Sequence, residues 1–448
     1  MLKKILVANR NEIAVRIIRA AKSMGIETVA IYSTADKEAL HVKLATEAVC
    51  VGSPLPRDSY LNMQNIVSAA LLTGCDGIHP GYGFLAENTK FARLVADSGL
   101  TFIGPDPEVI DTMGDKAKAR DTMIRHGVPV VPGTGAITDP AEGLAQAEKI
   151  GFPVLIKASA GGGGKGMRVC QSAGEFIKAY DMATAEALGA FGNGEVYLEK
   201  YVVNPKHIEW QVIGDRHGQV VHLYERDCSV QRNHQKIIEE APCQALRPEV
   251  RERMAADVIK AAQAVGYHNA GTFEFIMDQD QNYYFIEMNT RIQVEHPVSE
   301  MITGIDLIQE MIRVASGLPL SFTQEDVVVN GYSMECRINA EDPRNQFMPS
   351  AGKIDNLLLP GGFGVRMDTA LYQGFHVPPF YDSLVGKLIV HANTREACIQ
   401  KMRTALEELM VDGINTNIEL HYSLFHDQAF VAGQFDTGFL ADFLASGW

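Results

Sequence analysis

The chain has 448 residues, too many for one hydrophobic core, so we expect roughly two to four domains. Its formal net charge of −15 argues against nucleic acid or an anionic membrane surface as a partner. The seven cysteines are scattered without a C-x-x-C pair, and no signal-peptide core or bilayer-spanning apolar run occurs. We therefore expect a reduced, cytoplasmic protein without a membrane segment.

The first 110 residues alternate short apolar runs with amphipathic stretches. The apolar runs are predicted strands, at 5–8, 28–32, 48–51, 77–78 and 101–103. This alternation predicts a parallel sheet with helices on both faces. The turn after the first run reads Ala-Asn-Arg-Asn-Glu-Ile and lacks the G-x-G-x-x-G fingerprint. The fold is thus expected to be Rossmann-like without an indication of NAD binding.

Further along the chain, the patterns change several times. A helical stretch is expected at 107–126, and strand patterns dominate 207–300. The segment after about 332 has its own strands and a helix near 395–410. These changes predict a separate C-terminal domain.

Glycines occupy positions 161–164 and are followed by Lys165 and Gly166. Ordering four glycines is entropically unfavourable. A run of glycines is nevertheless expected where their N–H groups wrap a phosphate and the loop must open and close. It is not a Walker A loop, because no Ser or Thr follows Lys165. A flexible linker is the alternative, but a predicted strand at 154–157 and the lysine within the loop favour phosphate binding.

Two strand-like runs, 271–278 and 283–289, flank a polar turn at 279–282. If position 278 faces 283, Glu274 lies opposite Glu287 with Cβ atoms about 4.5–5.5 Å apart. A divalent cation would reverse the repulsion between the two carboxylates, whereas two solvent-facing carboxylates are an equally open alternative. The opposite face is expected to pack on the core through Phe273, Phe275, Met277, Tyr284, Ile286 and Met288.

Arg291, Gln293 and Glu295 alternate, so an extended chain would place them on one side. Together they could hold and deprotonate a small oxyanion such as bicarbonate. On these residues alone, an edge strand with an ordinary salt bridge is the better interpretation. The segment 207–213 alternates as well, with His207, Glu209 and Gln211 on one side. The segment 225–236 is dense with polar residues, and the alternative to a functional role for it is a solvated loop.

Several motifs together resemble biotin carboxylases, and the resemblance extends from residue 1 to about 440. The block at 285–297, Phe-Ile-Glu-Met-Asn-Thr-Arg-Ile-Gln-Val-Glu-His-Pro, is the most specific to biotin-dependent carboxylases. The other motifs lie at 8–10, 79–84, 113–116, 161–166, 225–228 and 335–342. The resemblance implies an α/β protein with a Rossmann-like N-terminal domain at 1–114, an ATP-grasp domain at 115–330 with a mobile glycine-rich lid at about 132–203, and an α+β C-terminal domain at 331–446.

The resemblance also implies a reaction. ATP and bicarbonate would form carboxyphosphate and carboxylate biotin on a separate biotin carboxyl carrier protein, with two Mg²⁺ or Mn²⁺ ions. This would be the first half-reaction of acetyl-CoA carboxylase, which makes malonyl-CoA for fatty acid synthesis; a pyruvate or propionyl-CoA carboxylase is the alternative. Because no Met-Lys-Met tripeptide occurs and the chain stops where the C-terminal domain should end, we expect carrier and carboxyltransferase partners on other chains.

Site residues follow from the matching motifs. The implied nucleotide-binding residues are Lys116, Lys157, Gly162, Gly163, Gly164, Glu199, Lys200, Val202, His207, Gln231, His234, Glu274, Ile276 and Glu287. The implied metal ligands are Glu274, Glu287 and Asn289. Bicarbonate would be held by Lys236, Arg291, Gln293 and Val294, with Glu295 as the base. Tyr82 would lie near biotin, and Arg337 would stabilise the biotin enolate.

Three positions depart from the usual family pattern. Asn11 replaces a glycine, which the turn should tolerate because asparagine adopts positive φ more readily than most residues. Ala86 stands where serine is common, so a helix cap is expected to be lost. The expected homodimer surface is partly retained: Ser23 replaces an acidic residue, and the positions that match are Arg16, Arg19, Phe363 and Arg366.

Two rival functions remain to be weighed against this one. Another ATP-grasp ligase, of the carbamoyl-phosphate or purine-pathway type, is disfavoured by the 291–295 block and by Arg337. A non-catalytic nucleotide-binding subunit would be expected to lack a metal ligand or the base. The intact Glu274, Glu287 and Glu295 therefore argue for an enzyme.

Overall fold

The computed structural model describes residues 1–158, 167–191 and 193–448. The chain divides into two compact units. The larger contains 1–128, 206–275 and 287–448, and the smaller contains 129–205 and 276–286. Both are mixed α/β, as predicted. The predicted glycine loop, with Gly162, Gly163 and Gly164, lies outside the described residues.

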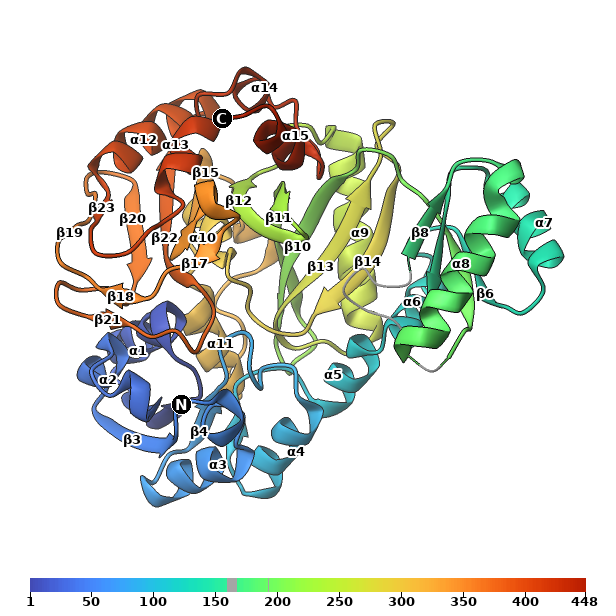
Figure 1. Cartoon of the computed structure of the whole chain (residues 1–448). Coiled ribbons are helices and arrows are strands. Elements are labelled where there is room, and N and C mark those ends of the chain that lie inside the picture. Colours follow the sequence, from blue (N-terminus) through green and yellow to red (C-terminus); the bar gives the residue numbers. More distant parts are fainter. Residues whose placement is uncertain (159–166, 192) are drawn as a thin grey trace. The chain divides into compact units, whose positions relative to one another are not determined.

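The N-terminal segment forms the predicted parallel sheet, with strand order β3-β2-β1-β4-β5 (Figure 1). Ile5 and Val7 of the central strand β1 pack in one core cluster, and Leu6 packs in another. Alternate side chains of a strand face opposite sides, so both faces of this sheet are buried. The strands are β1 (Lys4–Val7), β2 (Glu27–Ser33), β3 (Glu47–Gly52), β4 (Gly77–His79) and β5 (Thr101–Phe102). Their helices are α1 (Asn11–Ser23), α2 (Leu40–Leu44), α3 (Met63–Leu72) and α4 (Thr89–Asp97).

Two of the departures from the family pattern have structural outcomes. Asn11 has φ of 59°, so the residue that replaces glycine adopts the left-handed conformation that was predicted for it. The expectation of a lost cap at Ala86 is wrong. Ala86 is buried, and helix α4 is capped by Asn88, whose side chain accepts a hydrogen bond from the Phe91 N–H.

The helix that was predicted at 107–126 is two helices, α5 (Pro107–Gly114) and α6 (Lys116–Arg125). Asp115 separates them in an extended conformation, and its carboxylate accepts hydrogen bonds from the N–H groups of Ala117 and Lys118. An aspartate that caps a new helix competes with continuation of the old one. The local capping therefore places Lys116 at the first position of α6.

An eight-stranded sheet, with order β14-β13-β10-β11-β12-β15-β22-β20, carries the polar motifs. Its strands are β10 (Lys206–Gly214), β11 (Val220–Arg232), β12 (Gln235–Ala241), β13 (Asn269–Met277), β14 (Tyr283–Asn289), β15 (Tyr332–Asn339), β20 (Val365–Thr369) and β22 (Leu384–Ala392). Helices α9 (Pro248–Ala264), α10 (His296–Thr303) and α11 (Leu307–Ala315) interrupt the strands. Helix α9 was not predicted; its buried residues are Val250, Met254, Val258, Ala261 and Ala262.

The C-terminal segment packs on the β15–β22 part of this sheet. Helix α12 (Arg395–Glu408) confirms the helix that was predicted near 395–410. Its buried Cys398 and Met402 share a core cluster with Met334 and Leu388. Smaller helices follow: α13 (Ile418–Leu424), α14 (Gln428–Val431) and α15 (Phe439–Ala445). Short two-stranded sheets pair β16 (Glu341–Asp342) with β17 (Met348–Pro349), β18 (Gly352–Lys353) with β21 (His376–Val377), and β19 (Leu357–Leu358) with β23 (Met410–Val411).

The smaller unit has an antiparallel sheet with order β6-β9-β7-β8. Its strands are β6 (Gly133–Ile137), β7 (Val154–Ala158), β8 (Met167–Cys170) and β9 (Val196–Lys200). Helices α7 (Pro140–Ile150) and α8 (Ala173–Phe191) supply Ala147 and Phe176 to its core. Among the described residues of the chain, no helix has the length and hydropathy to cross a bilayer.

Candidate active site

Arg226 is fully buried at the centre of the polar cluster on the eight-stranded sheet. On β11 it lies opposite Glu209 of β10, and its Nε donates to the Glu209 carboxylate at 2.5 Å. Its Nη1 donates to Gln211 at 2.8 Å and to Ser299 at 3.0 Å. The solvated-loop interpretation of 225–236 therefore holds only for the exposed turn at 233–235, because strand β11 buries Glu225, Arg226 and Asp227 in the sheet.

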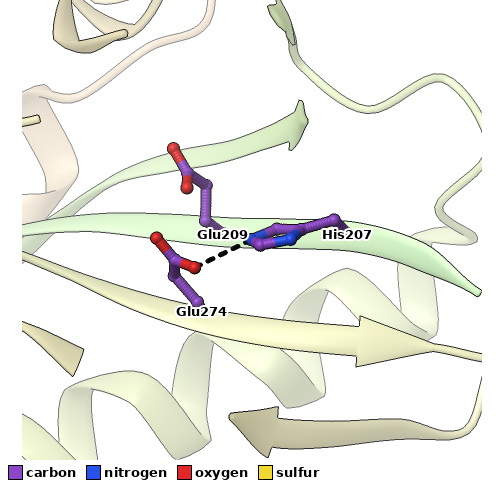
Figure 2. A group of neighbouring side chains, drawn as sticks. All are labelled: His207, Glu209 and Glu274. Carbon is purple, nitrogen blue, oxygen red and sulfur yellow. Dashed lines mark ion pairs between the residues drawn. The ribbon is translucent and has the colours of Figure 1, made fainter. Parts of the chain in front are cut away.

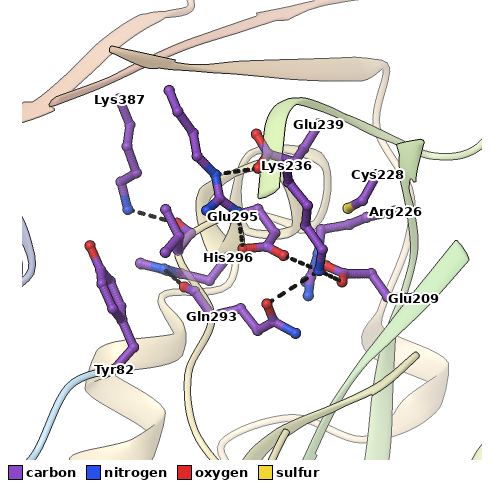
Figure 3. Close-up of polar contacts among 12 residues, drawn as sticks. Tyr82, Glu209, Arg226, Cys228, Lys236, Glu239, Gln293, Glu295, His296 and Lys387 are labelled. Carbon is purple, nitrogen blue, oxygen red and sulfur yellow. Dashed lines mark hydrogen bonds and ion pairs between the residues drawn. The ribbon is translucent and has the colours of Figure 1, made fainter. Parts of the chain in front are cut away.

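The ammonium of Lys236, on β12, is where the carboxylates converge (Figure 3). It donates to Glu209, to Glu274 at 3.0 Å and to Glu295 at 2.7 Å, and lies 3.5 Å from the Gln293 side-chain oxygen. Burial by itself would lower the pKa of this lysine, but the three carboxylates outweigh it and raise the pKa well above its ordinary value. The three carboxylates therefore favour the protonated, cationic form of Lys236.

Glu295 stands at the start of helix α10 and is fully buried. One oxygen accepts from Lys236, and the other accepts from Arg337 Nη2 at 2.9 Å. Burial opposes ionisation, but the charges of Lys236 and Arg337 hold the pKa of Glu295 well below its usual range. Arg337 Nε also donates to Glu239 at 2.5 Å, and burial raises the pKa of that second carboxyl to about 7. Arg337 thus joins two carboxyl groups of different proton affinity.

The extended strand predicted for 291–295 does not form, because the chain turns here into helix α10. Gln293 and Glu295 are nevertheless buried beside Lys236, so the surface-edge interpretation is also wrong. Arg291 has other partners: its Nε donates to Glu87 at 2.9 Å, and its Nη2 donates to Asn289 Oδ1 at 2.8 Å. A turn can bring alternate residues close together when their side chains contact the same cation.

Glu274, on β13, is the second carboxylate that Lys236 contacts. Its Oε1 also accepts from Asn289 Nδ2 at 2.7 Å and from Gln293 Nε2 at 2.8 Å, and its Oε2 lies 3.0 Å from His207 Nε2 (Figure 2). Burial opposes ionisation, but Lys236 and His207 lower the pKa of Glu274 well below its usual range. Asn289 and Glu274, which were predicted as metal ligands, are therefore in direct contact.

Glu287 has a different environment from Glu274. Its side chain is 37% exposed, and its carboxylate pairs at 3.2 Å with Lys116, whose side chain is 80% exposed. The predicted hairpin pairing also needs correction. The Asp278 N–H donates to the carbonyl of Asn282 at 2.9 Å, so the turn closes one residue earlier than a pairing of 278 with 283.

The predicted apolar face of the hairpin is correct for β13 but not for β14. Phe273, Phe275 and Met277 are buried, whereas on β14 the buried aromatics are Tyr283 and Phe285. Tyr284 and Ile286, which were expected in the core, are half-buried. Because side chains alternate, a one-residue change in turn length moves the first side chains of the strand to the other face. Met288 is buried as expected, so the alternation changes phase between Phe285 and Met288.

Three more predicted nucleotide residues belong to the larger unit. His207 Nδ1 lies 2.9 Å from the Gln231 side-chain nitrogen, which also donates to the Cys228 carbonyl at 2.8 Å. His234 is exposed in the tight turn between β11 and β12, where Asn233 and His234 have φ of 49° and 65°. His207 and Gln231 are thus fixed to the Glu274 cluster, whereas His234 faces solvent.

The remaining predicted nucleotide residues belong to the smaller unit. Lys157 on β7 forms an ion pair with Glu199 on β9, and the two strands are direct neighbours. Lys200 donates to the carbonyls of Gly151 at 2.6 Å and Phe152 at 3.1 Å. Val202 and Ile276 lie in the same unit.

A second buried group lies beside the Lys236 cluster. The Tyr82 hydroxyl donates to Glu12, and Lys387 Nζ lies 3.3 Å from the same carboxylate. Lys387 also donates to the Val294 carbonyl at 2.7 Å. The sequence interpretation missed both charged residues, although a lysine in the apolar run 384–390 is an available signal. It also assigned no role to Glu209, Arg226 or Glu239.

Two groups among the described residues have potential ligand atoms within 4.8 Å of one another: His207, Glu209 and Glu274, and Glu209, Cys228 and Glu295. The Lys236 ammonium contacts two carboxylates in each group. Both groups therefore already have a cation, the Lys236 ammonium, beside their carboxylates.

Comparisons with known proteins agree with this architecture. Family models match in three segments: the biotin carboxylase N-terminal domain at 1–110, the ATP-binding domain of the carbamoyl-phosphate synthase L chain at 115–323, and the biotin carboxylase C-terminal domain at 335–442. Biotin carboxylase 1 of Bacillus subtilis is 54% identical over all of both chains.

Solved structures give the same result. The biotin carboxylase domain dimer of Hydrogenobacter thermophilus 2-oxoglutarate carboxylase, in complex with MgADP, ADP and bicarbonate, has a TM-score of 0.91 and 53% identity, covering 99% of this chain and 98% of that chain. The biotin carboxylase subunit of a pyruvate carboxylase has a TM-score of 0.90 and 53% identity, covering 99% of both chains. The chain belongs to the biotin carboxylase family, and it is an ATP-grasp ligase of that type.

Proposed function

We propose that this chain is the biotin carboxylase of an acetyl-CoA carboxylase, and that it carboxylates carrier-bound biotin as the first step towards malonyl-CoA. The observation that carries the chemistry is the contact of one ammonium, that of Lys236, with Glu274 and Glu295. This cation joins the proposed metal ligand to the proposed base. An anionic substrate at Lys236 would therefore lie between a nucleotide–metal site and a proton acceptor.

Bicarbonate is the anion that fits this position. Lys236, Arg291 and Gln293 would donate hydrogen bonds to it, with the backbone of Val294. Glu295, kept ionised by its cations, would accept the bicarbonate proton. When bicarbonate shares the charge of Lys236, less of that charge stabilises the Glu295 carboxylate, so its pKa would rise towards a value suited to a base. The bicarbonate complex of the Hydrogenobacter thermophilus domain supports this assignment.

ATP and Mg²⁺ would occupy the adjoining position. Glu274, Glu287 and Asn289 offer oxygen donors, the class that Mg²⁺ prefers. The residues fit the ion: Glu274 is ionised, and the exposed Lys116–Glu287 pair is a weak, water-screened contact that a metal contact can replace. Bound with the nucleotide, Mg²⁺ would neutralise charge on the phosphate oxygens. Two ions, with Mn²⁺ as a substitute, remain our expectation.

Lys116, Lys157, His207, Gln231 and His234 would contact the nucleotide. Glu199, Lys200, Val202 and Ile276 would line the adenine pocket, and Gly162, Gly163 and Gly164 would cover the phosphates. The MgADP complex of the Hydrogenobacter thermophilus domain supports a nucleotide role for this fold.

Arg337 would connect the two chemical steps. Bicarbonate attack on the γ-phosphate would release ADP and give carboxyphosphate, which breaks down to carbon dioxide and phosphate. The phosphate would deprotonate biotin, and the resulting enolate would add to carbon dioxide. The Arg337 guanidinium, held between Glu239 and Glu295, would stabilise the enolate of biotin, with Tyr82 nearby. A charged group that already touches the base can act at both steps without moving far.

The final acceptor is the finer part of the proposal. Relatives include a 2-oxoglutarate carboxylase small subunit and a pyruvate carboxylase subunit, each 53% identical. A pyruvate carboxylase role is therefore the second candidate. Carrier and carboxyltransferase chains would complete the enzyme.

We also propose domains at 1–114, 115–330 and 331–446 and a cytoplasmic location. We further propose a homodimer, which the dimer in a relative supports.

The test is phosphate release from Mg–ATP by the purified chain, with and without bicarbonate and free biotin. We expect release to require bicarbonate and to be stimulated by biotin. Phosphate release that depends on neither bicarbonate nor biotin would contradict the proposal. Transfer of labelled carboxyl groups to acetyl-CoA or pyruvate, after reconstitution with carriers and carboxyltransferases of each class, then distinguishes the acceptors.

A further inference from the structure

Lys387 is a fully buried lysine on β22, outside the group of residues that we assign to substrates. It pairs in register with Arg337 on β15 and with Asp368 on β20. Cross-strand partners project from the same face of a sheet. Lys387 therefore shares a face with the arginine proposed for biotin. Burying an ammonium is unfavourable unless partners compensate for the lost water, so the partners define the role.

The ammonium of Lys387 joins three segments that are far apart in the sequence. It donates to the carbonyl of Val294 at 2.7 Å and pairs with Glu12 of helix α1 at 3.3 Å. Glu12 also accepts a hydrogen bond from the Tyr82 hydroxyl (Figure 3 shows Tyr82 and Lys387). The loop that carries the proposed base is thus tied to the N-terminal helix and to the C-terminal sheet.

The neighbouring carbonyl is held in the same way. His296 is fully buried, and burial lowers its pKa well below its usual value, so the ring is neutral. Its Nδ1 lies 2.7 Å from the Gln293 carbonyl, and a carbonyl only accepts, so Nδ1 carries the proton. Two successive carbonyls, of Gln293 and Val294, therefore receive hydrogen bonds from buried side chains. This fixes two successive peptide planes directly before Glu295.

We propose that Lys387 is a positioning residue for bicarbonate binding, acting through the Val294 carbonyl. It orients the 293–295 loop so that Glu295 meets the Lys236 ammonium. The inference rests on the proposed function. Lys387 itself does not contact the substrate in this role, since its ammonium is engaged by Val294 and Glu12.

The experiment uses the whole chain and compares two variants. Lys387→Met keeps the length of the side chain but removes the donor to Val294. We expect its KM for bicarbonate to rise about tenfold or more, because small misplacements of a binding group have large kinetic effects. Its KM for ATP should stay within about twofold. The variant also leaves Glu12 buried without its cation, so its melting temperature should fall.

The double variant Lys387→Met/Glu12→Gln separates positioning from stability. It removes both buried charges, so we expect its melting temperature to recover towards that of the parent. Its KM for bicarbonate should stay high, because Val294 still lacks the donor. Lys401→Met is the matched control. Lys401 donates to the carbonyls of Phe363 at 2.8 Å and His391 at 2.6 Å, and its loss should leave the KM for bicarbonate unchanged.

The outcomes distinguish the inference from the proposed function. A double variant with the parent's KM for bicarbonate would show that Lys387 only neutralises Glu12, and the inference would fail. Equal rises in the KM values for ATP and bicarbonate in Lys387→Met would overturn it as well. If the parent itself shows no bicarbonate-dependent ATP cleavage, it is the proposed function that fails.

Discussion

The Lys236 cluster gives the most demanding prediction. In the Lys236→Met variant, Glu209, Glu274 and Glu295 lose their common cation. Each keeps another partner: Arg226, His207 and Arg337, respectively. Removing one partner of a buried ion pair costs about 3–5 kcal/mol. Because the remaining partners compensate in part, we expect a loss of about 3 kcal/mol of folding free energy near neutral pH.

The loss should depend on pH. In the parent, the pKa values of Glu274 and Glu295 lie well below the ordinary value of 4.5, so their stabilisation is present above that pH and is lost as pH falls. In the variant, burial without Lys236 should raise these pKa values above 4.5. The protonated forms are then favoured, so the penalty is relieved as pH falls. The difference in stability between parent and variant should therefore shrink between about pH 7.5 and pH 5.

Chemical denaturation of both proteins in chelator, at these two pH values, measures the difference. Lys206→Met is the matched control, because among the described residues Lys206 forms an ion pair with one buried carboxylate, that of Asp227, at 2.9 Å. It should be less destabilised and should keep bicarbonate-dependent ATP cleavage, whereas Lys236→Met should lose about 100-fold or more of that activity. Equal stability of parent and Lys236→Met at both pH values would refute the idea that one ammonium holds the carboxylates together.

Other expectations are simpler to test. Glu287→Gln should change the stability of the metal-free protein by no more than about 0.5 kcal/mol, since the partner of Glu287, Lys116, is exposed. Its ATP cleavage with Mg²⁺ should nevertheless fall by orders of magnitude. A variant that melts several degrees lower and turns over normally would rule out metal ligation. Hydrogen exchange at 160–167 should slow when a non-hydrolysable ATP analogue binds, and unchanged exchange at confirmed occupancy would contradict loop closure. Sedimentation should show a homodimer at micromolar concentration, with the 97% exposed Phe363 ring in its interface, so Phe363→Ala should shift the protein towards monomer; a parent that is already monomeric would refute the dimer.

Local sequence patterns were sufficient to predict the structure of segments whose conformation depends mainly on their own residues. The parallel sheet of the first 110 residues follows from alternating apolar runs, and positive φ at Asn11 follows from the conformational freedom of asparagine. The break at Asp115 is local as well, but its signal, an aspartate followed by free N–H groups, was read as the interior of one helix. The predicted hairpin register failed because it depends on turn length, and a turn that closes one residue earlier moves the first side chains of β14 to the opposite faces.

The sequence by itself determined the family and the fold class and supplied most of the proposed site residues, because those inferences depend on residue types in short, fixed spacings. Only the tertiary structure decided which charges meet. Lys236 collects carboxylates from three other segments, and Lys387 joins helix α1 to the Val294 carbonyl. A buried charge is stable only beside partners that replace water, and those partners are set by how distant segments pack. No local pattern records that packing.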